Sequence, residues 1–138
     1  MSTVRHTYAP DVDDDTDRST LASNRPITFV TDEVMQATLT TTRTYTLLIL
    51  RRGPAYHDAS AREIVREHAR RNLGLRADGV LDVVCPTTDD SGVCGVGIFD
   101  APVDEVEAIM AGDPGVVAGV FTWELHPCRG FPGDALAS

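Results

Sequence analysis

The chain has 138 residues, enough for one domain with its own hydrophobic core and a tail. Its formal net charge of -9 disfavours nucleic acid or an anionic membrane surface as the main partner, because both would repel an acidic protein. All 12 basic residues are Arg, which excludes mechanisms that form a Schiff base on Lys.

Cysteine usage and hydropathy predict a reducing, cytoplasmic location. Cys85, Cys94 and Cys128 are odd in number and widely spaced, so they support neither a disulfide framework nor a zinc site. No apolar run approaches the roughly 20 residues that a membrane helix needs. The N-terminus also lacks the hydrophobic centre of a secretory signal.

The first segment, residues 1–26, is predicted to be a disordered acidic tail, because it is rich in Asp, Ser and Thr and poor in large apolar side chains. A calcium site is the alternative, and its ligands would be Asp11, Asp13, Asp14, Asp15 and Asp17. The Gly turn and terminal Glu of a calcium-binding loop are absent, so the pattern favours the tail.

Residues 27–42 are predicted to form an N-terminal extension that packs on the main domain. Within it, ITFV is compatible with a short strand, and DEVMQATL with one or two helical turns capped by Thr31 or Asp32. The main domain is expected over residues 43–132, and residues 133–138 form a C-terminal tail.

The main domain opens with an apolar strand at residues 44–50 and an amphipathic helix at residues 58–79. Asp58 or Ser60 can cap this helix, since a short side-chain oxygen accepts from the unpaired N–H groups of a first turn. His68 lies four residues after Ile64, which places its imidazole on the apolar face of the helix.

The second half of the domain predicts two further strands, a helix and a last strand. Residues 80–86 and 93–100 read as an antiparallel hairpin with a polar loop, and residues 101–111 show helical spacing of apolar side chains. Asp113 and Pro114 can start a short helical turn. Residues 120–126 form the last strand, which Pro127 is expected to end.

The predicted order is therefore strand, helix, strand, strand, helix, strand, which is the α+β ferredoxin-like βαββαβ sandwich. Both helices must cover one face of the sheet. The apolar side chains of the other face then need a cover from outside the chain, and a homodimer joined through the sheet faces is expected.

One candidate site follows from this topology. The end of the first helix and the turn after the second can approach one another, which brings His68 near Asp113. A carboxylate that accepts from one ring nitrogen fixes the tautomer and leaves the other nitrogen as a general base or acid. A structural role is the alternative, in which a buried His simply bonds a helix-capping Asp.

Four segments carry a family resemblance: YTLLILRRGP, EHARRNLGLRADG, CPTTDDSG and AGDPGVVAGVFTWELHP. With them the chain resembles the YciI-like (YCII-related) family of small dimeric α/β-barrel proteins, over residues 45 to about 130. The resemblance implies a ferredoxin-like dimeric α/β barrel without cofactor or metal, and a His–Asp dyad that falls on His68 and Asp113. Activity in the family includes elimination of hydrogen chloride from a chlorinated hydroxyquinol.

The chain departs from this family at Cys85, where many relatives carry Gly before the proline, so the pocket is expected to be narrower. Cys85 could act as a nucleophile, although a role as a small apolar strand residue is favoured. Further substrate-binding candidates, each with a packing or surface role as the alternative, are Arg52, Trp123, His126 and Arg129.

The leading functional hypothesis is a cofactor-free lyase or isomerase of the kind used in secondary metabolism. It would remove a proton from a small aromatic, quinone-like or lactone intermediate, with His68 as base and Asp113 as its orienting partner; Arg52 or His126 would steady the resulting oxyanion. A metabolite-binding or accessory protein is the alternative. A cofactor-independent monooxygenase is the third possibility.

Overall fold

The computed structural model describes residues 25–138, so the predicted acidic tail lies almost entirely outside the described residues. The chain divides into two compact units, Met1–Thr40 and Thr41–Ser138. The described part of the first unit holds one helix, and the second unit holds the sheet and the candidate site.

The described part of the first unit contains helix α2 (Asp32–Leu39), which confirms the predicted helical turns. Its cap is Thr31, whose hydroxyl oxygen accepts from the Val34 N–H at 3.2 Å. The short strand expected at residues 27–30 is not formed. No residue of α2 is buried within the described chain, and the predicted packing of this extension on the main domain stays a prediction.

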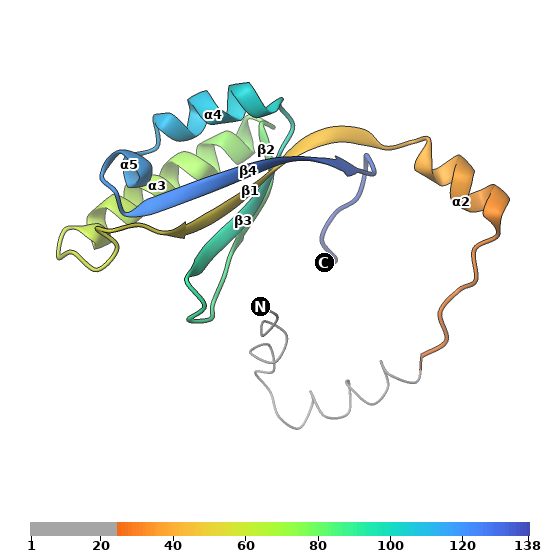
Figure 1. Ribbon diagram of the computed structural model, residues 1–138, viewed down its shortest axis with the longest axis horizontal. Coiled ribbons are helices and arrows are strands. Elements are labelled where there is room, and N and C mark those ends of the chain that lie inside the picture. Colours follow the sequence, from red (N-terminus) through yellow and green to blue (C-terminus); the bar gives the residue numbers. More distant parts are fainter. Residues whose placement is uncertain (1–24) are drawn as a thin grey trace. The chain divides into compact units, whose positions relative to one another are not determined.

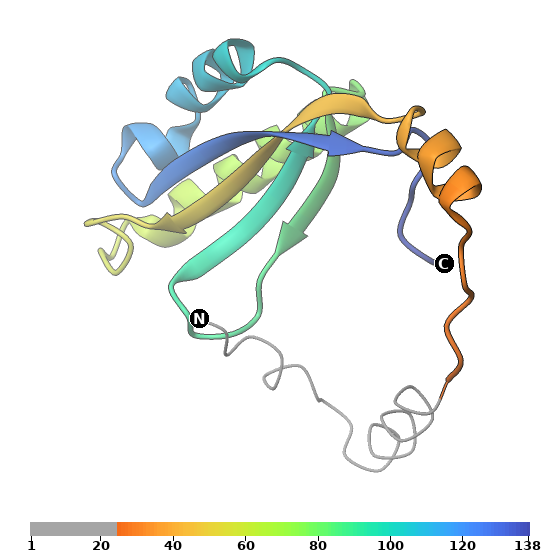
Figure 2. The same ribbon diagram turned by 45° about the vertical axis from the view of Figure 1, so that its right-hand side comes forward.

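The second unit is an α+β domain whose single four-stranded sheet is antiparallel, in the order β2-β3-β1-β4. Helices α3, α4 and α5 lie together on one face of this sheet (Figures 1 and 2). The order of elements and strands is compatible with a ferredoxin-like sandwich. Its elements are β1 (Arg43–Arg52), α3 (Ala61–Ala77), β2 (Leu81–Pro86), β3 (Val93–Phe99), α4 (Val103–Ala111), α5 (Pro114–Val117) and β4 (Phe121–Gly130).

The core forms where the inner face of the sheet meets the helices. Strand β1 alternates between buried and half-buried residues from Tyr45 to Leu50, as expected when successive side chains point to opposite faces. Its buried Leu48 and Leu50 lie against the helical layer. The other buried apolar residues of the core are Ala61, Leu81, Phe99, Val106, Met110, Val120 and Phe121.

Two local predictions are wrong. Pro127 does not end the last strand, because β4 continues to Gly130 with Pro127 opposite Thr46. β4 is an edge strand, and an edge strand tolerates a residue that has no N–H to donate. The side-chain cap predicted for α3 is also missing, since neither described candidate provides it: Ser60 makes no cap bond, and Asp58 accepts from Ala61 through its main-chain oxygen.

One close contact fixes the corner at which α5 meets β4. Gly115 lies in α5 directly against the Phe121 ring, and a Cβ atom at this position would come within 2.5 Å of a ring carbon. The absence of a side chain at Gly115 therefore allows Phe121 to enter the core, where it also contacts His68.

We expect Gly115→Ala to lower the free energy of unfolding by about 1–3 kcal/mol, because the added methyl group overpacks a rigid contact. Urea denaturation measures the change. Gly74→Ala is the matched control, since Gly74 lies in α3 with open space around it and should gain up to about 1 kcal/mol. Equal stability of the wild type and Gly115→Ala would contradict the proposed packing.

Candidate active site

His68 projects from the inner face of α3, as its spacing from Ile64 predicts. It is one of two buried residues of this helix, with 7% of its surface exposed. Its ring lies 4.7 Å from the Phe121 ring, centroid to centroid, so an apolar surface supports one side of the imidazole. The ring thus sits at the boundary between the helical layer and the sheet.

Asp113 is fully buried and caps α5. Its Oδ2 atom accepts hydrogen bonds from the backbone N–H groups of Gly115 at 2.9 Å and Val116 at 3.2 Å. Pro114 occupies the first helical position, where its missing N–H costs no hydrogen bond. The predicted helical turn after Asp113 is confirmed, and it fixes the position of the carboxylate.

The structure brings His68 and Asp113 together. The Nδ1 atom of His68 lies 2.9 Å from Oδ1 and 2.8 Å from Oδ2 of Asp113. Because an ionised carboxylate can only accept, Nδ1 carries the proton and donates it. This contact fixes the tautomer in which Nε2 of the neutral ring has a free lone pair.

Asp113 remains ionised at neutral pH. Burial works to raise the pKa of this carboxyl, but the hydrogen bond and charge of His68 and the N–H groups of Val116 and Gly115 outweigh it, so the pKa lies below its ordinary value. The Arg71 guanidinium also approaches, with Nη1 3.7 Å from Oδ1. That nitrogen is buried and forms no hydrogen bond with any described residue.

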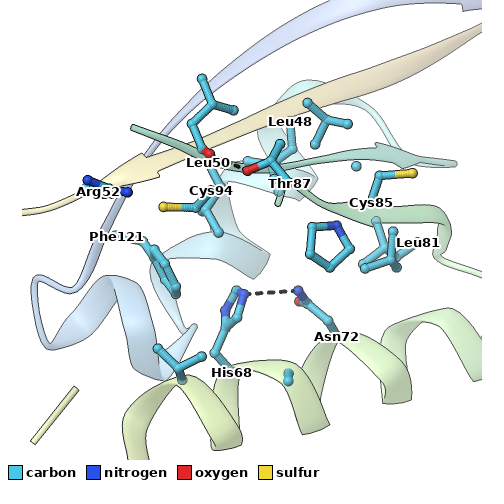
Figure 3. Close-up of a pocket in the computed structure, with 18 of the residues that line it drawn as sticks. Leu48, Leu50, Arg52, His68, Asn72, Leu81, Cys85, Thr87, Cys94 and Phe121 are labelled. Atoms are coloured by element: carbon cyan, nitrogen blue, oxygen red, sulfur yellow. Dashed lines mark hydrogen bonds between the residues drawn. The ribbon is translucent and has the colours of Figure 1, made fainter. Parts of the chain in front are cut away.

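Asn72 is a site residue that the sequence reasoning missed. It lies on α3 four residues after His68, and its Nδ2 atom is 3.2 Å from Nε2 of the imidazole (Figure 3). Residues at this spacing are neighbours on a helix surface. The signal was therefore present in the sequence, because any polar residue one turn from a candidate base can reach it.

A cavity of about 420 Å³ opens beside His68 and Asn72, between α3 and the inner face of the sheet (Figure 3). Gly95 and Gly97 of β3 also line the cavity, and they pair with Leu50 and Leu48. Most of the wall is apolar. Among its other lining residues are Leu48, Leu50, Val65, Leu81, Val84, Phe121, Arg52, Tyr56, Thr87 and Asp89.

Of the predicted substrate-binding residues, only Arg52 lines this cavity. Its Nη2 atom lies 2.6 Å from Asp90 Oδ1, and its guanidinium stacks 4.9 Å from the centre of the Tyr56 ring. Asp90 is almost fully exposed, and the pKa of its carboxyl is lowered by Arg52. A cation is therefore held at the cavity wall by a partner that faces solvent.

The other three candidates lie elsewhere. Trp123 packs against the hydrophobic core without lining the cavity. His126 is exposed on β4, with Nε2 2.8 Å from Glu124 Oε2. Arg129 borders a separate shallow hollow with Thr44 and Cys128. Their predicted substrate-binding roles find no support in the position of the cavity.

Two thiols also reach the cavity wall, at Cys85 and Cys94. Burial raises the pKa of the Cys94 thiol and outweighs the opposing charge of Arg52, so the thiol is protonated at neutral pH. The nitrogens of His68 are engaged by Asp113 and Asn72, so the imidazole is not positioned by a contact with either cysteine. His68 therefore activates neither thiol through a hydrogen bond.

Within residues 25–138, no group of three or more His, Cys, Asp or Glu side chains is arranged to hold a metal ion. The helices of the same residues include none with the length and apolar character needed to cross a membrane.

No protein-family model matches this chain, and comparison with curated proteins finds no significant match.

The hydrogen bonds of Asp113 make the stability of the domain sensitive to acid. Since the folded pKa lies below the ordinary 3.8, the contribution of this carboxylate is complete above that pH and is lost as pH falls through the lower value. We expect Asp113→Ala to cost about 2–4 kcal/mol at neutral pH, because a helix cap and a buried hydrogen-bond acceptor disappear together.

Urea denaturation measures how the free energy of unfolding changes between neutral pH and pH values below 3.8. The proteins to compare are the wild type, Asp113→Asn and Asp82→Asn. Asp82 is exposed on β2, so its variant should follow the wild type. Asp113→Asn should lose less stability on acidification than the wild type or Asp82→Asn. Identical acid dependence in all three proteins would contradict the account.

Proposed function

We propose that this protein is a cofactor-free lyase or isomerase in which His68 removes a proton from a carbon atom of a small substrate. One observation carries the proposal. A buried carboxylate holds Nδ1 of an imidazole whose other nitrogen lies at the wall of a cavity large enough for a small ring compound. The resemblance to the YciI-like family supports the same pair of residues.

In this mechanism Nε2 takes the proton from a C–H bond next to a carbonyl group. The electron pair of that bond forms a carbon–carbon double bond, and the carbonyl π electrons move to the oxygen. Asp113 stabilises the imidazolium that results, since its carboxylate already accepts from Nδ1. Return of the proton at another carbon gives an isomerase, and loss of a leaving group such as chloride gives a lyase.

The shape and composition of the cavity support a planar, largely apolar substrate of the aromatic, quinone-like or lactone type. Leu48, Leu81 and Phe121 offer an apolar surface, whereas Arg52 offers a positive charge for a polar substituent. The ion pair of Arg52 with Asp90 is exposed on its Asp side and therefore exchanges at little cost. Arg52 is in this proposal the residue that orients the substrate.

We also infer that the protein is a homodimer joined through its sheets, as a dimeric α/β barrel. The face of the sheet opposite the helices carries Leu47, Ile49, Val96 and Ile98, which pair across β1 and β3. These side chains are half-buried or exposed in the single chain. A second copy would bury them by presenting the same apolar face.

A second candidate function is binding of a metabolite without turnover. The observation that favours it is the contact of Asn72 with Nε2, because a hydrogen bond to that nitrogen competes with its use as a base. The two candidates differ in whether replacing His68 removes a reaction or only changes an affinity.

The base function can be tested with 5-nitrobenzisoxazole, a small planar compound whose ring opens on loss of one C–H proton to a coloured phenolate. We expect the wild type to open it about 10²–10⁴ times faster than His68→Ala, the range typical of a positioned general base. Absorbance of the product gives the rate.

Arg66→Gln is the control for this test, because Arg66 is exposed on the same helix and does not line the cavity. Circular dichroism checks that each variant is folded. A wild-type rate no greater than that of His68→Ala would overturn the proposed base and leave metabolite binding as the better description.

The dimer can be tested with Ile49→Asp, which places a charge in the apolar open face. We expect the wild type to sediment as a dimer at micromolar concentration and the variant as a folded monomer, because an unpaired buried charge is strongly unfavourable. Ala108→Asp, at an exposed position of α4, is the control and should remain dimeric. A monomeric wild type would contradict the inference.

A further inference from the structure

The polar contact between Asn72 and His68 defines a second functional group inside the cavity. Both side chains line the cavity, and Nδ2 of Asn72 lies 3.2 Å from Nε2 of His68. Asp113, by contrast, is fully buried behind the imidazole and does not line it. A bound molecule that meets the base therefore also meets the Asn72 amide.

The direction of each hydrogen bond follows from the chemistry of the partners. Asp113 can only accept, so Nδ1 donates to it and Nε2 has a lone pair. The Asn72 amide nitrogen can only donate, so it donates to that lone pair. In the free protein, the base is thus occupied by the Asn72 N–H group.

Protonation of the base reverses this arrangement. Once Nε2 carries a proton it becomes a donor, and two N–H groups then point toward each other. The Asn72 N–H group thereby loses its acceptor at the moment when negative charge appears on the substrate oxygen, and a nearby anionic oxygen is the strongest acceptor that this N–H can take.

We propose that Asn72 is a catalytic residue that donates a hydrogen bond to the oxygen on which negative charge develops when His68 removes the proton. This inference rests on the proposed function and identifies the substrate class of the site. The proton moves to Nε2, the C–H electron pair forms the new double bond, and the carbonyl π pair ends on the oxygen that Asn72 holds.

The spacing of the two groups fits a particular substrate. In a carbonyl compound the acidic carbon and the oxygen are separated by bonds of about 1.5 and 1.2 Å, so they lie roughly 2.4 Å apart. Nε2 of His68 and Nδ2 of Asn72 lie 3.2 Å apart, so they can contact such a carbon and such an oxygen of one molecule at the same time. The spacing therefore suits a substrate with a C–H bond next to its carbonyl group, which among the ring compounds proposed above means a cyclic ketone, a quinone-like compound or a lactone.

Among the polar side chains that line the cavity, Asn72 is the one within hydrogen-bond distance of Nε2 of His68. In Figure 3, Asn72 and Arg52 lie on opposite sides of His68. Arg52 is bonded to Asp90 and stacked on Tyr56, which suits it to hold a distant substituent. The wall near the amide is apolar, and in a dry surrounding a fixed donor stabilises charge more than it does in water.

The first test measures binding of 4-nitrophenolate, a stable planar oxyanion, by its visible absorbance in the wild type, Asn72→Ala, His68→Ala and the double variant. We expect the Asn72 replacement to weaken binding about tenfold or more, with or without His68, because a hydrogen bond to a charged group is lost. Nitrobenzene, which lacks the oxyanion, should bind all four proteins with similar affinity.

Equal affinity of the wild type and Asn72→Ala for 4-nitrophenolate would overturn the proposal. A loss that occurs only when His68 is present would overturn it too, since Asn72 would then act through the imidazole. Asn72→Asp, of the same size but without the donor, should bind the anion at least as weakly as Asn72→Ala. This test needs no turnover, so it remains decisive even if His68 is not a base.

The second test uses a series of benzisoxazoles whose product phenolates differ in basicity. We expect Asn72→Ala to lower kcat about 10²–10³-fold with little change in KM, as for loss of one oxyanion donor. The loss should grow with the basicity of the product. A constant loss across the series would mean that Asn72 only orients His68, and an unchanged kcat would exclude any role in the reaction.

Discussion

The hydrogen bond between His68 and Asp113 is the contact on which the candidate site depends. A buried carboxylate is unfavourable unless each of its oxygens finds a partner, and here the imidazole and two backbone N–H groups provide them. The same bonds begin α5 and join it to α3. The group that orients the candidate base therefore also holds two helices together, so the functional and the structural roles of Asp113 cannot be separated by removing it.

Because of this contact, the two nitrogens of the imidazole differ chemically. Nδ1 faces a fixed charge inside the protein, whereas Nε2 faces the cavity beside the Asn72 amide. Phe121 supports the ring, and the close contact of Phe121 with Gly115 connects the imidazole to α5 a second time. An imidazole restrained on three sides loses little orientational freedom when a substrate arrives, which is the condition for efficient proton transfer.

Much of the fold could be predicted from the sequence, because strand and helix periodicities are local. The inward position of His68 and the helical start at Asp113 follow from spacing and capping chemistry alone. The failures are of another kind. Pro127 ends a strand only if the strand is internal, which depends on the order of strands in the sheet.

The predictions of site residues also divide into those that depend on local spacing and those that depend on how the strands pair. His126 is sequence-adjacent to residues of the inner face, but its pairing with Leu47 places it on the opposite face from Leu48. Whether a residue of β4 lines the cavity therefore depends on the register of the strands, which residue types do not reveal. Asn72 was missed for a different reason: its position one turn after the predicted base was visible in the sequence, but only the folded contact distinguishes it from the other polar residues of the helix.

Two residues without side chains, Gly95 and Gly97, line the cavity from β3. Gly95 and Gly97 face the helices from β3, and a Cβ atom at Gly97 would lie 3.1 Å from Leu81 and 3.8 Å from Leu48. A Cβ atom at Gly95 would lie 3.1 Å from the Cys85 carbonyl oxygen, so a side chain at either glycine would displace atoms of the cavity wall and not the imidazole, the carboxylate or the amide. In the proposed function, ligand size and proton removal would thus be controlled by different elements, so evolution could alter one while the other stays constant.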